Sequence, residues 1–233
     1  MDSLLLRLAG PLQAWGASSR FVYRGTEIAP TKSGVIGMLA AAKGIRRTEP
    51  LTELLGLSFA VRLDQPGTVI RDFQTARRLD GTSLPLSYRH YLSDAVFVAA
   101  VGGEADLLTG LHEALRRPQF PLYLGRRSCP PVLPVSLGVH PGTPVDVLSR
   151  HEWQASAWHR RSKRTATVQL EVLRDADQTD QVSETIRDEP VSFDPSHRQH
   201  GWRLVVREHV ELPHPDPQVP RVPRHDPMSV VGG

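Results

Sequence analysis

Alternating apolar and polar positions in the N-terminal part of the chain predict a succession of strands and helices. The first apolar run, residues 4–8, is too short for a membrane span, so we expect a buried strand there. Apolar residues then recur at helical spacing between Thr31, a candidate N-cap, and Gly44. A second stripe of this kind, over residues 104–117, ends before a proline and predicts another helix.

Further apolar segments complete the order of elements. Residues 57–64 alternate like a half-exposed strand, residues 68–75 form another strand, and residues 95–101 are apolar on both faces. An apolar segment at 131–139 follows the second helix. The resulting order matches the β-α-β-β-α-β plan, so we predict an α+β protein with a ferredoxin-like core, as in the RNA recognition motif. Because the central strand offers only Phe97 as an aromatic, any RNA contact is expected from loops and from the insertion over residues 76–91.

The rest of the chain predicts an insertion, a smaller region and a tail. Residues 76–91 lack a core pattern and are expected to form a long insertion within a domain that spans residues 1–140. Two alternating segments predict a small C-terminal β-rich region over 141–212. The acidic, polar run 175–189 is expected to be a mobile loop. The proline-rich residues 213–233 are expected to be extended or disordered.

Basic residues change this picture by suggesting a polyanionic partner. Only three of the 28 Lys and Arg residues are lysine, and the sequence pI is about 9.3. Arginine suits phosphate because its planar fork donates two hydrogen bonds at once, although a GC-rich genome gives the same bias. Basic pairs recur at Arg46 and Arg47, Arg77 and Arg78, Arg116 and Arg117, Arg126 and Arg127, and Arg160 and Arg161. This recurrence favours a polyanion.

The sequence contains no motif that indicates a metal site, a cofactor site or contact with a membrane. The lone Cys129 excludes an internal disulfide and a multi-cysteine zinc site, and the C-terminal histidines lack ligand spacing. The segment PTKSG at 30–34 lacks the glycine spacing of a nucleotide P-loop. We therefore predict no metal, cofactor or membrane contact, and the cytoplasm as the compartment.

Three loops are candidates for RNA contact. The first follows the N-terminal strand, where Trp15 either packs beneath the loop or forms a contact surface with the following Arg20 and Arg24. The second is the start of the first helix at Lys32 and Ser33, where free N–H groups and the helix dipole favour phosphate. The third contains Gly125, Arg126 and Arg127, in which glycine lets backbone N–H groups approach a phosphate. A simple turn with two solvated arginines is the alternative for that loop.

Five segments together resemble the CasD family of type I-E CRISPR Cascade complexes. They are GPLQAWG at 10–16, PTKSGVIGMLAAAKG at 30–44, RDFQTA at 71–76, YRHYLSDAVF at 88–97 and LGRRSCPP at 124–131. The resemblance implies a non-catalytic subunit that grips the 5′ handle of the CRISPR RNA, caps the CasC filament and contacts the large subunit CasA. It implies antiviral defence by a complex that binds target DNA through its guide.

The resemblance also assigns roles to residues. The handle-facing surface would include Trp15, Lys32, Ser33 and the loop at 125–127. The insertion at 76–91 would be the family's thumb, which wedges against a CasC subunit and the guide. Its candidate RNA contacts are Arg77, Arg78 and Arg89.

The alternative is a metal-independent endoribonuclease that processes the CRISPR repeat, as in type I-C relatives. Such cleavage needs a base for the 2′-hydroxyl and an acid or cation for the leaving group. Tyr88, His90 and Tyr91 in the insertion are the candidates, but nothing in the sequence brings them within mutual reach.

Overall fold

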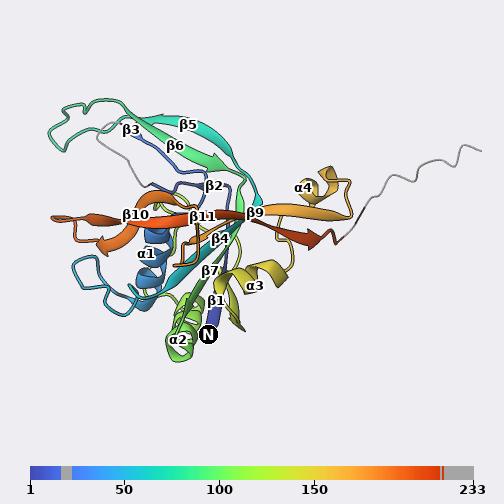
Figure 1. Ribbon diagram of the computed structural model, residues 1–233. Helices are drawn as coiled ribbons and strands as arrows, with labels where there is room; N and C mark the ends of the chain where they lie inside the picture. The colour runs from blue at the N-terminus through green and yellow to red at the C-terminus, as the bar shows by residue number, and fades with distance from the viewer. Residues whose placement is uncertain (17–22, 216, 218–233) are drawn as a thin grey trace, which may run out of the picture.

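The computed structural model describes residues 1–16, 23–215 and 217, and Arg20 and most of the proline-rich tail lie outside them. Two sheets, most of whose strand pairs are antiparallel, combine with four helices (Figure 1). The strands are β1 (Asp2–Ala9), β2 (Leu12–Gln13), β3 (Tyr23–Arg24), β4 (Ser58–Gln65), β5 (Thr68–Gln74), β6 (Ser87–Ser93), β7 (Val96–Gly103), β8 (Ser136–Pro141), β9 (Thr167–Asp175), β10 (Glu184–Ser192) and β11 (Gln199–Pro213). The helices are α1 (Lys32–Lys43), α2 (Ala105–Arg116), α3 (Pro144–Arg150) and α4 (Ala157–Ser162).

The larger sheet has seven strands in the order β10-β11-β9-β4-β7-β1-β8, all paired antiparallel. Strand β1 lies between β7 and β8, with Leu4 opposite Val101 on one side and Val139 on the other. Its central position explains why its apolar run is continuous, because both faces are buried. The expected strands and helices of the N-terminal part are thus present, in a mixed α and β protein.

Helices cover both faces of this sheet. Leu4, Leu6 and Leu8 of β1 belong to one core cluster with residues of α1 and α2. The intervening Leu5 belongs to a second cluster on the opposite face, where α3 contributes Leu148. Side chains that alternate along a strand point to opposite faces, so a single strand supplies both cores.

Helix α1 lies between the two residues that the sequence predicted as its limits, Thr31 and Gly44. The Thr31 hydroxyl accepts a hydrogen bond from the N–H of Gly34 (3.3 Å), and Gly44 ends the helix at φ +86°. Ser and Thr are favoured N-caps, and the left-handed conformation at a C-terminus favours glycine.

The C-terminal strands continue the same sheet, because β9 pairs with β4. The expectation of a mobile loop over 175–189 was wrong for its second half: β10 begins at Glu184 and pairs with β11. Polar composition misled the prediction, since four of the nine residues of this edge strand are exposed, three are partly buried and only two are buried. The division proposed near residue 140 stays a prediction.

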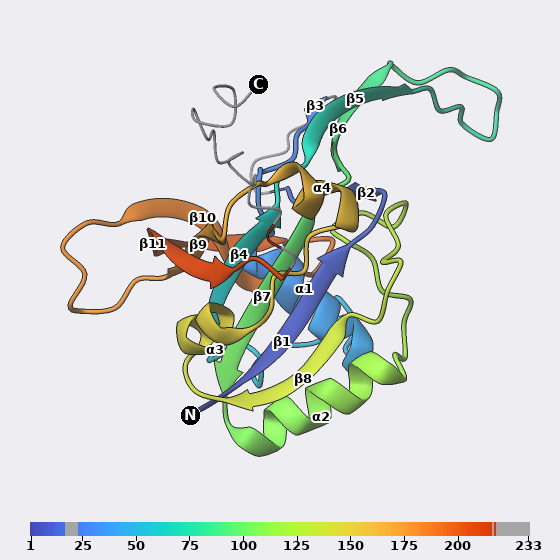
Figure 2. The ribbon, with the colours of Figure 1, turned by 90° about the vertical axis from the view of Figure 1, so that its right-hand side faces the viewer.

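Strands β5 and β6 form a hairpin that projects from the rest of the protein (Figure 2). Within a second sheet, β6 also pairs with β2 and β3. The expected insertion at 76–91 therefore consists of the exposed hairpin tip and most of β6. Among the described residues, no helix has the length and apolar character to cross a membrane.

A network of charged side chains joins α1 to the C-terminal strands. The carboxylate of Asp188 on β10 is 1% exposed and accepts from the Lys32 backbone N–H (2.8 Å) and from the guanidinium of Arg203 (2.6 and 2.9 Å). Asp175 accepts from Arg203 and from the Lys32 ammonium (2.8 and 3.2 Å). The Lys32 ammonium also pairs with Glu189 at 2.9 Å. Each buried charge thus has a partner of opposite sign.

Replacing Asp188 tests this network. In the Asp188→Ala variant the Arg203 guanidinium and the first N–H of α1 lose a buried acceptor, so the free energy of unfolding should fall by about 3 kcal/mol. Urea denaturation followed by circular dichroism measures the change. The exposed Asp80 is the control, and Asp80→Ala should change it by less than about 0.5 kcal/mol. Equal effects of the two variants would contradict the role given to Asp188.

Candidate functional site

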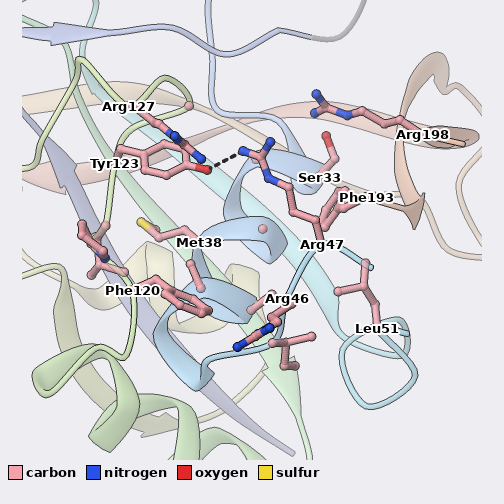
Figure 3. A pocket seen from close by; sticks show the side chains of 18 of the residues that line it. Ser33, Met38, Arg46, Arg47, Leu51, Phe120, Tyr123, Arg127, Phe193 and Arg198 are labelled. Atoms are coloured by element: carbon pink, nitrogen blue, oxygen red, sulfur yellow. Dashed lines mark hydrogen bonds between the residues drawn. The ribbon is translucent and has the colours of Figure 1, made fainter. Parts of the chain in front are cut away.

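A pocket of about 970 Å³ lies against α1, between that helix and three loops. The loops run over residues 45–51, 120–130 and 193–198, so segments far apart in the sequence meet here. Its lining includes Ser33, Met38, Arg46, Arg47, Leu51, Phe120, Tyr123, Gly125, Arg127, Phe193 and Arg198 (Figure 3). We call it the arginine pocket.

The floor of the arginine pocket is a face of α1 with small side chains. Gly34, Gly37, Ala40 and Ala41 line it, and the ring of Phe193 packs where a Cβ on Gly37 would come within 3.4 Å. The absence of bulky side chains on this face leaves room that the neighbouring loops do not fill. The inner surface is therefore apolar and hollow.

The charge of the arginine pocket is of one sign. Four arginines line it, and no Asp or Glu is among its lining residues. The guanidinium of Arg47 donates to the Tyr123 hydroxyl (3.1 Å). Loss of water around its guanidinium and the charge of Arg47 lower the pKa of Arg198. Like charges held together without a carboxylate favour binding of an anion such as phosphate.

Three of the residues predicted for RNA contact line the arginine pocket, namely Ser33, Gly125 and Arg127. Lys32 does not, because its ammonium pairs with Asp175 and Glu189. The first N–H of α1 donates to Asp188 rather than remaining free. The prediction that Lys32 binds a phosphate at the start of this helix is therefore wrong, because Asp175 and Glu189 already neutralise its charge.

Trp15 is fully buried. Of the two roles considered for it, packing beneath the loop is therefore the one that the structure shows. Its indole N–H donates to the Gln13 side chain (3.0 Å), and its ring packs where a Cβ on Gly34 would come within 2.8 Å. A ring without exposed surface cannot stack on a base. The prediction of Trp15 as an RNA contact is corrected accordingly.

Arg126 and Gly125 have structural explanations. The guanidinium of Arg126 donates to the carbonyls of His90 (2.9 Å), Arg24 (2.7 Å) and Gly25 (3.1 Å), and lies 4.8 Å from the centre of the Tyr91 ring. Gly125 has φ +83°, and a Cβ there would come within 1.8 Å of the Ala14 carbonyl oxygen. A Gly125→Ala variant thus tests folding rather than RNA binding, and Arg126 fastens the loop to β3 and β6.

The remaining predicted residues lie on the second sheet and its hairpin. Arg24 and Arg89 are partners in the β3–β6 register, and Arg77 and Arg78 are exposed near the hairpin tip. None of these four lines the arginine pocket. Arg20 lies outside the described residues.

The sequence did not single out three residues of this site. Arg46 and Arg47 were visible only as one of several basic pairs, and Arg198 carried no signal because it lies in a polar loop far along the chain. Their convergence follows from packing of the 193–198 loop against α1, which no local pattern encodes.

The three candidate nuclease residues do not all lie on one face of β6. Tyr88 and His90 are two positions apart and share a face, whereas Tyr91 points to the opposite face because successive side chains of a strand alternate. Tyr91 is 3% exposed and lies beneath Arg126. Within the described part of the chain, no group of three or more His, Cys, Asp or Glu is arranged to hold a metal ion.

The fold and the site can now be compared with known proteins: a mixed α and β core carries a projecting hairpin and a pocket lined by four arginines and by no Asp or Glu. Residues 3–206 match the model of the family described as CRISPR-associated protein (Cas_Cas5), and the chain belongs to this family. The CRISPR system Cascade subunit CasD of Escherichia coli (strain K12) is 37% identical over 157 residues, which cover 58% of this chain and 70% of that protein. The resemblance to CasD is thereby confirmed.

Two solved structures are similar over nearly the whole chain. A chain of a CRISPR RNA-guided surveillance complex has a TM-score of 0.74 and 32% identity, and 91% of each chain is covered. A structure described as that of a Cas protein has a TM-score of 0.69 and 33% identity, with 94% of this chain and 97% of the other covered.

Adjacent arginines should behave differently when they are replaced. Arg126→Ala removes three hydrogen bonds to carbonyls and the packing on a ring, so we expect the free energy of unfolding to fall by about 2 kcal/mol. Arg127→Ala should change it by less than about 0.5 kcal/mol, because Arg127 makes no hydrogen bond or ion pair with any described residue. Urea denaturation of both variants compares them, and similar decreases would refute the distinction.

Proposed function

We propose that this chain is a non-catalytic subunit of a type I-E CRISPR Cascade complex, acting in antiviral defence in the cytoplasm. In that role it binds the 5′ handle of the CRISPR RNA, caps the CasC filament and contacts the large subunit CasA. Membership of the family, the identity to CasD and the likeness to a chain of a surveillance complex support this proposal.

The observation that carries the RNA-binding part is the charge of the arginine pocket. Arg46, Arg47, Arg127 and Arg198 meet there without a carboxylate among the lining residues. Elsewhere in the fold, arginines such as Arg203 and Arg174 are paired with acids. Unpaired arginines in a hollow site leave their N–H donors available to phosphate oxygens.

The hairpin is the proposed thumb that wedges against a CasC subunit and the guide. Phe73 is 65% exposed on β5, and Leu79 is fully exposed near the tip, close in sequence to Arg77 and Arg78. Apolar and basic side chains on a projecting element suit a protein and RNA contact together. We further propose that β1, α1, β4, β7, α2 and β8 form the ferredoxin-like core, supported by the strand order β4-β7-β1-β8.

Binding and cleavage of repeat RNA are separated in one experiment. The purified chain is incubated with labelled repeat RNA, with and without EDTA, and analysed by a binding curve and a denaturing gel. We expect intact RNA that binds better when the 5′ handle is present. Arg47→Ala and Arg127→Ala should each weaken binding, and the salt slope should fall by about one for each phosphate that the variant no longer neutralises.

Arg116→Ala is the control, because Arg116 is exposed on α2 and does not line the arginine pocket. It removes the same charge and should leave the salt slope unchanged. A specific cut that survives EDTA and disappears in His90→Ala would replace this proposal by the endoribonuclease.

A further inference from the structure

We propose that helix α4 and the residues that follow it bind a single strand of DNA. The surface consists of Trp158, Arg160, Arg161, Lys163 and Arg164, and we call it the α4 surface. It goes beyond the proposed function because it lies apart from the arginine pocket and takes a different ligand. Only the choice of DNA over RNA rests on that function: pairing of a guide with one strand of a duplex leaves the other strand unpaired.

The positive charge of the α4 surface has no acidic counterpart. Residues 153–170 contain three arginines, one lysine and no Asp or Glu. Arg161, Lys163 and Arg164 are exposed, and none of the four basic side chains forms an ion pair or hydrogen bond with a residue that the structure describes. The Nε of Arg160 is buried and still has no hydrogen-bond partner among those residues. The arginines of the neighbouring strands β9 and β11 are all paired with carboxylates, so these four cations are the ones available to a polyanion.

Trp158 presents an aromatic ring beside these charges. Its side chain is 54% exposed, and its indole N–H donates to the Asp94 carboxylate (3.2 Å). That hydrogen bond uses the only polar atom of the side chain, so the exposed part is apolar ring surface. A ring beside arginine and lysine can stack on an unpaired base while the cations neutralise its phosphates. A base within a duplex offers no such face, which favours a single strand.

The α4 surface is held in place at the foot of the hairpin formed by β5 and β6 (Figure 2). The N–H and hydroxyl of Ser156 donate to the Gln65 side chain (3.0 and 2.7 Å), and the Gln65 amide donates to the Asp94 carbonyl (2.6 Å). Gln65 ends β4, and Asp94 lies between β6 and β7. Because Trp158 is joined to the same Asp94, its position is set before a ligand arrives, which lowers the entropy lost on binding.

The α4 surface and the arginine pocket lie on opposite sides of the larger sheet. The segment that leads into α4 packs on the face that α3 covers, where the Gln154 N–H donates to the Asp64 carboxylate of β4 (2.6 Å) and the Trp153 indole to the Asp64 carbonyl (2.7 Å). Figures 1 and 2 show strands of this sheet between α4 and α1, and α1 is the floor of the arginine pocket. A strand bound at α4 therefore need not compete with RNA bound at the pocket.

The chemistry of the α4 surface also predicts how little sequence it reads. Lysine and arginine contact phosphates, which carry no sequence information, and an aromatic ring stacks on any base. We therefore expect the surface to bind single strands of different sequence with similar affinity.

Fluorescence anisotropy of the full chain with a labelled oligothymidylate of about 12 nucleotides tests the inference, with and without saturating handle RNA. Replacing both Arg161 and Arg164 by Ala should weaken DNA binding and lower the salt slope by about 1.4, since each phosphate contact of a single strand contributes about 0.7. Trp158→Ala should weaken binding about tenfold and Trp158→Phe much less, because phenylalanine keeps a ring. Binding of a duplex of the same length should not respond to Trp158→Ala.

Two variants are matched controls. Replacing both Arg116 and Arg117 by Ala removes the same charge from the exposed end of α2. Trp202→Ala removes a ring that is 66% exposed on β11. Both should bind the oligothymidylate as the unaltered chain does, and thermal unfolding establishes that every variant is folded.

This inference and the proposed function fail in different ways. The inference is overturned if the α4 variants bind the oligothymidylate normally, if Trp158→Ala weakens duplex binding equally, or if handle RNA displaces the DNA and the α4 variants lose the handle instead. Weaker handle binding by Arg47→Ala and Arg127→Ala would still support the proposed function. If DNA binding depends on the α4 surface but those two variants bind handle RNA normally, the inference holds and the RNA site assigned to the arginine pocket is wrong.

Discussion

The carboxylate of Asp188 fixes α1 against the C-terminal strands, and both sides of the arginine pocket depend on that position. It accepts from the first N–H of the helix and from Arg203 of β11. The helix supplies the pocket floor, and the loop that follows β10 supplies Phe193 and Arg198. Because a negative charge at a helix N-terminus also complements the helix dipole, one buried side chain serves stability and the geometry of the site.

Charge is distributed unequally between the interior and the arginine pocket. Lys32 and Arg203 are surrounded by three carboxylates, so their charges are compensated within the fold. Arg47 and Arg198 line the arginine pocket, where loss of water around the Arg198 guanidinium and the charge of Arg47 lower the pKa of Arg198. Like charges held this close work against the stability of the fold, and the RNA phosphates that we propose as their partner would compensate them.

The sequence predicted the elements better than it predicted the site, because hydrophobic periodicity is local and the contacts of the site are not. The runs that became β1, α1, β7 and α2 were recognisable from their apolar spacing alone. The role of Asp188 could not be predicted, because nothing in the sequence distinguishes this one buried carboxylate from the exposed acidic residues around it. The sequence could not distinguish Arg126 from Arg127 either, because the two are adjacent and chemically identical. After the turn at Gly125, Arg126 donates to the His90 carbonyl within the fold, whereas Arg127 lines the arginine pocket.

Glycines of α1 and of the 120–130 loop connect packing to chemistry. Glycine within a helix costs about 1 kcal/mol relative to alanine, yet Gly34 admits the ring of Trp15 and Gly37 admits the ring of Phe193. Gly125 allows the loop to approach the Ala14 carbonyl, which sets the point where Arg126 turns into the fold and Arg127 into the pocket. A Cβ at Gly34 or Gly125 would therefore force the Trp15 ring or the Ala14 carbonyl to move, whereas a Cβ at Gly37 would meet Phe193 at ordinary contact distance.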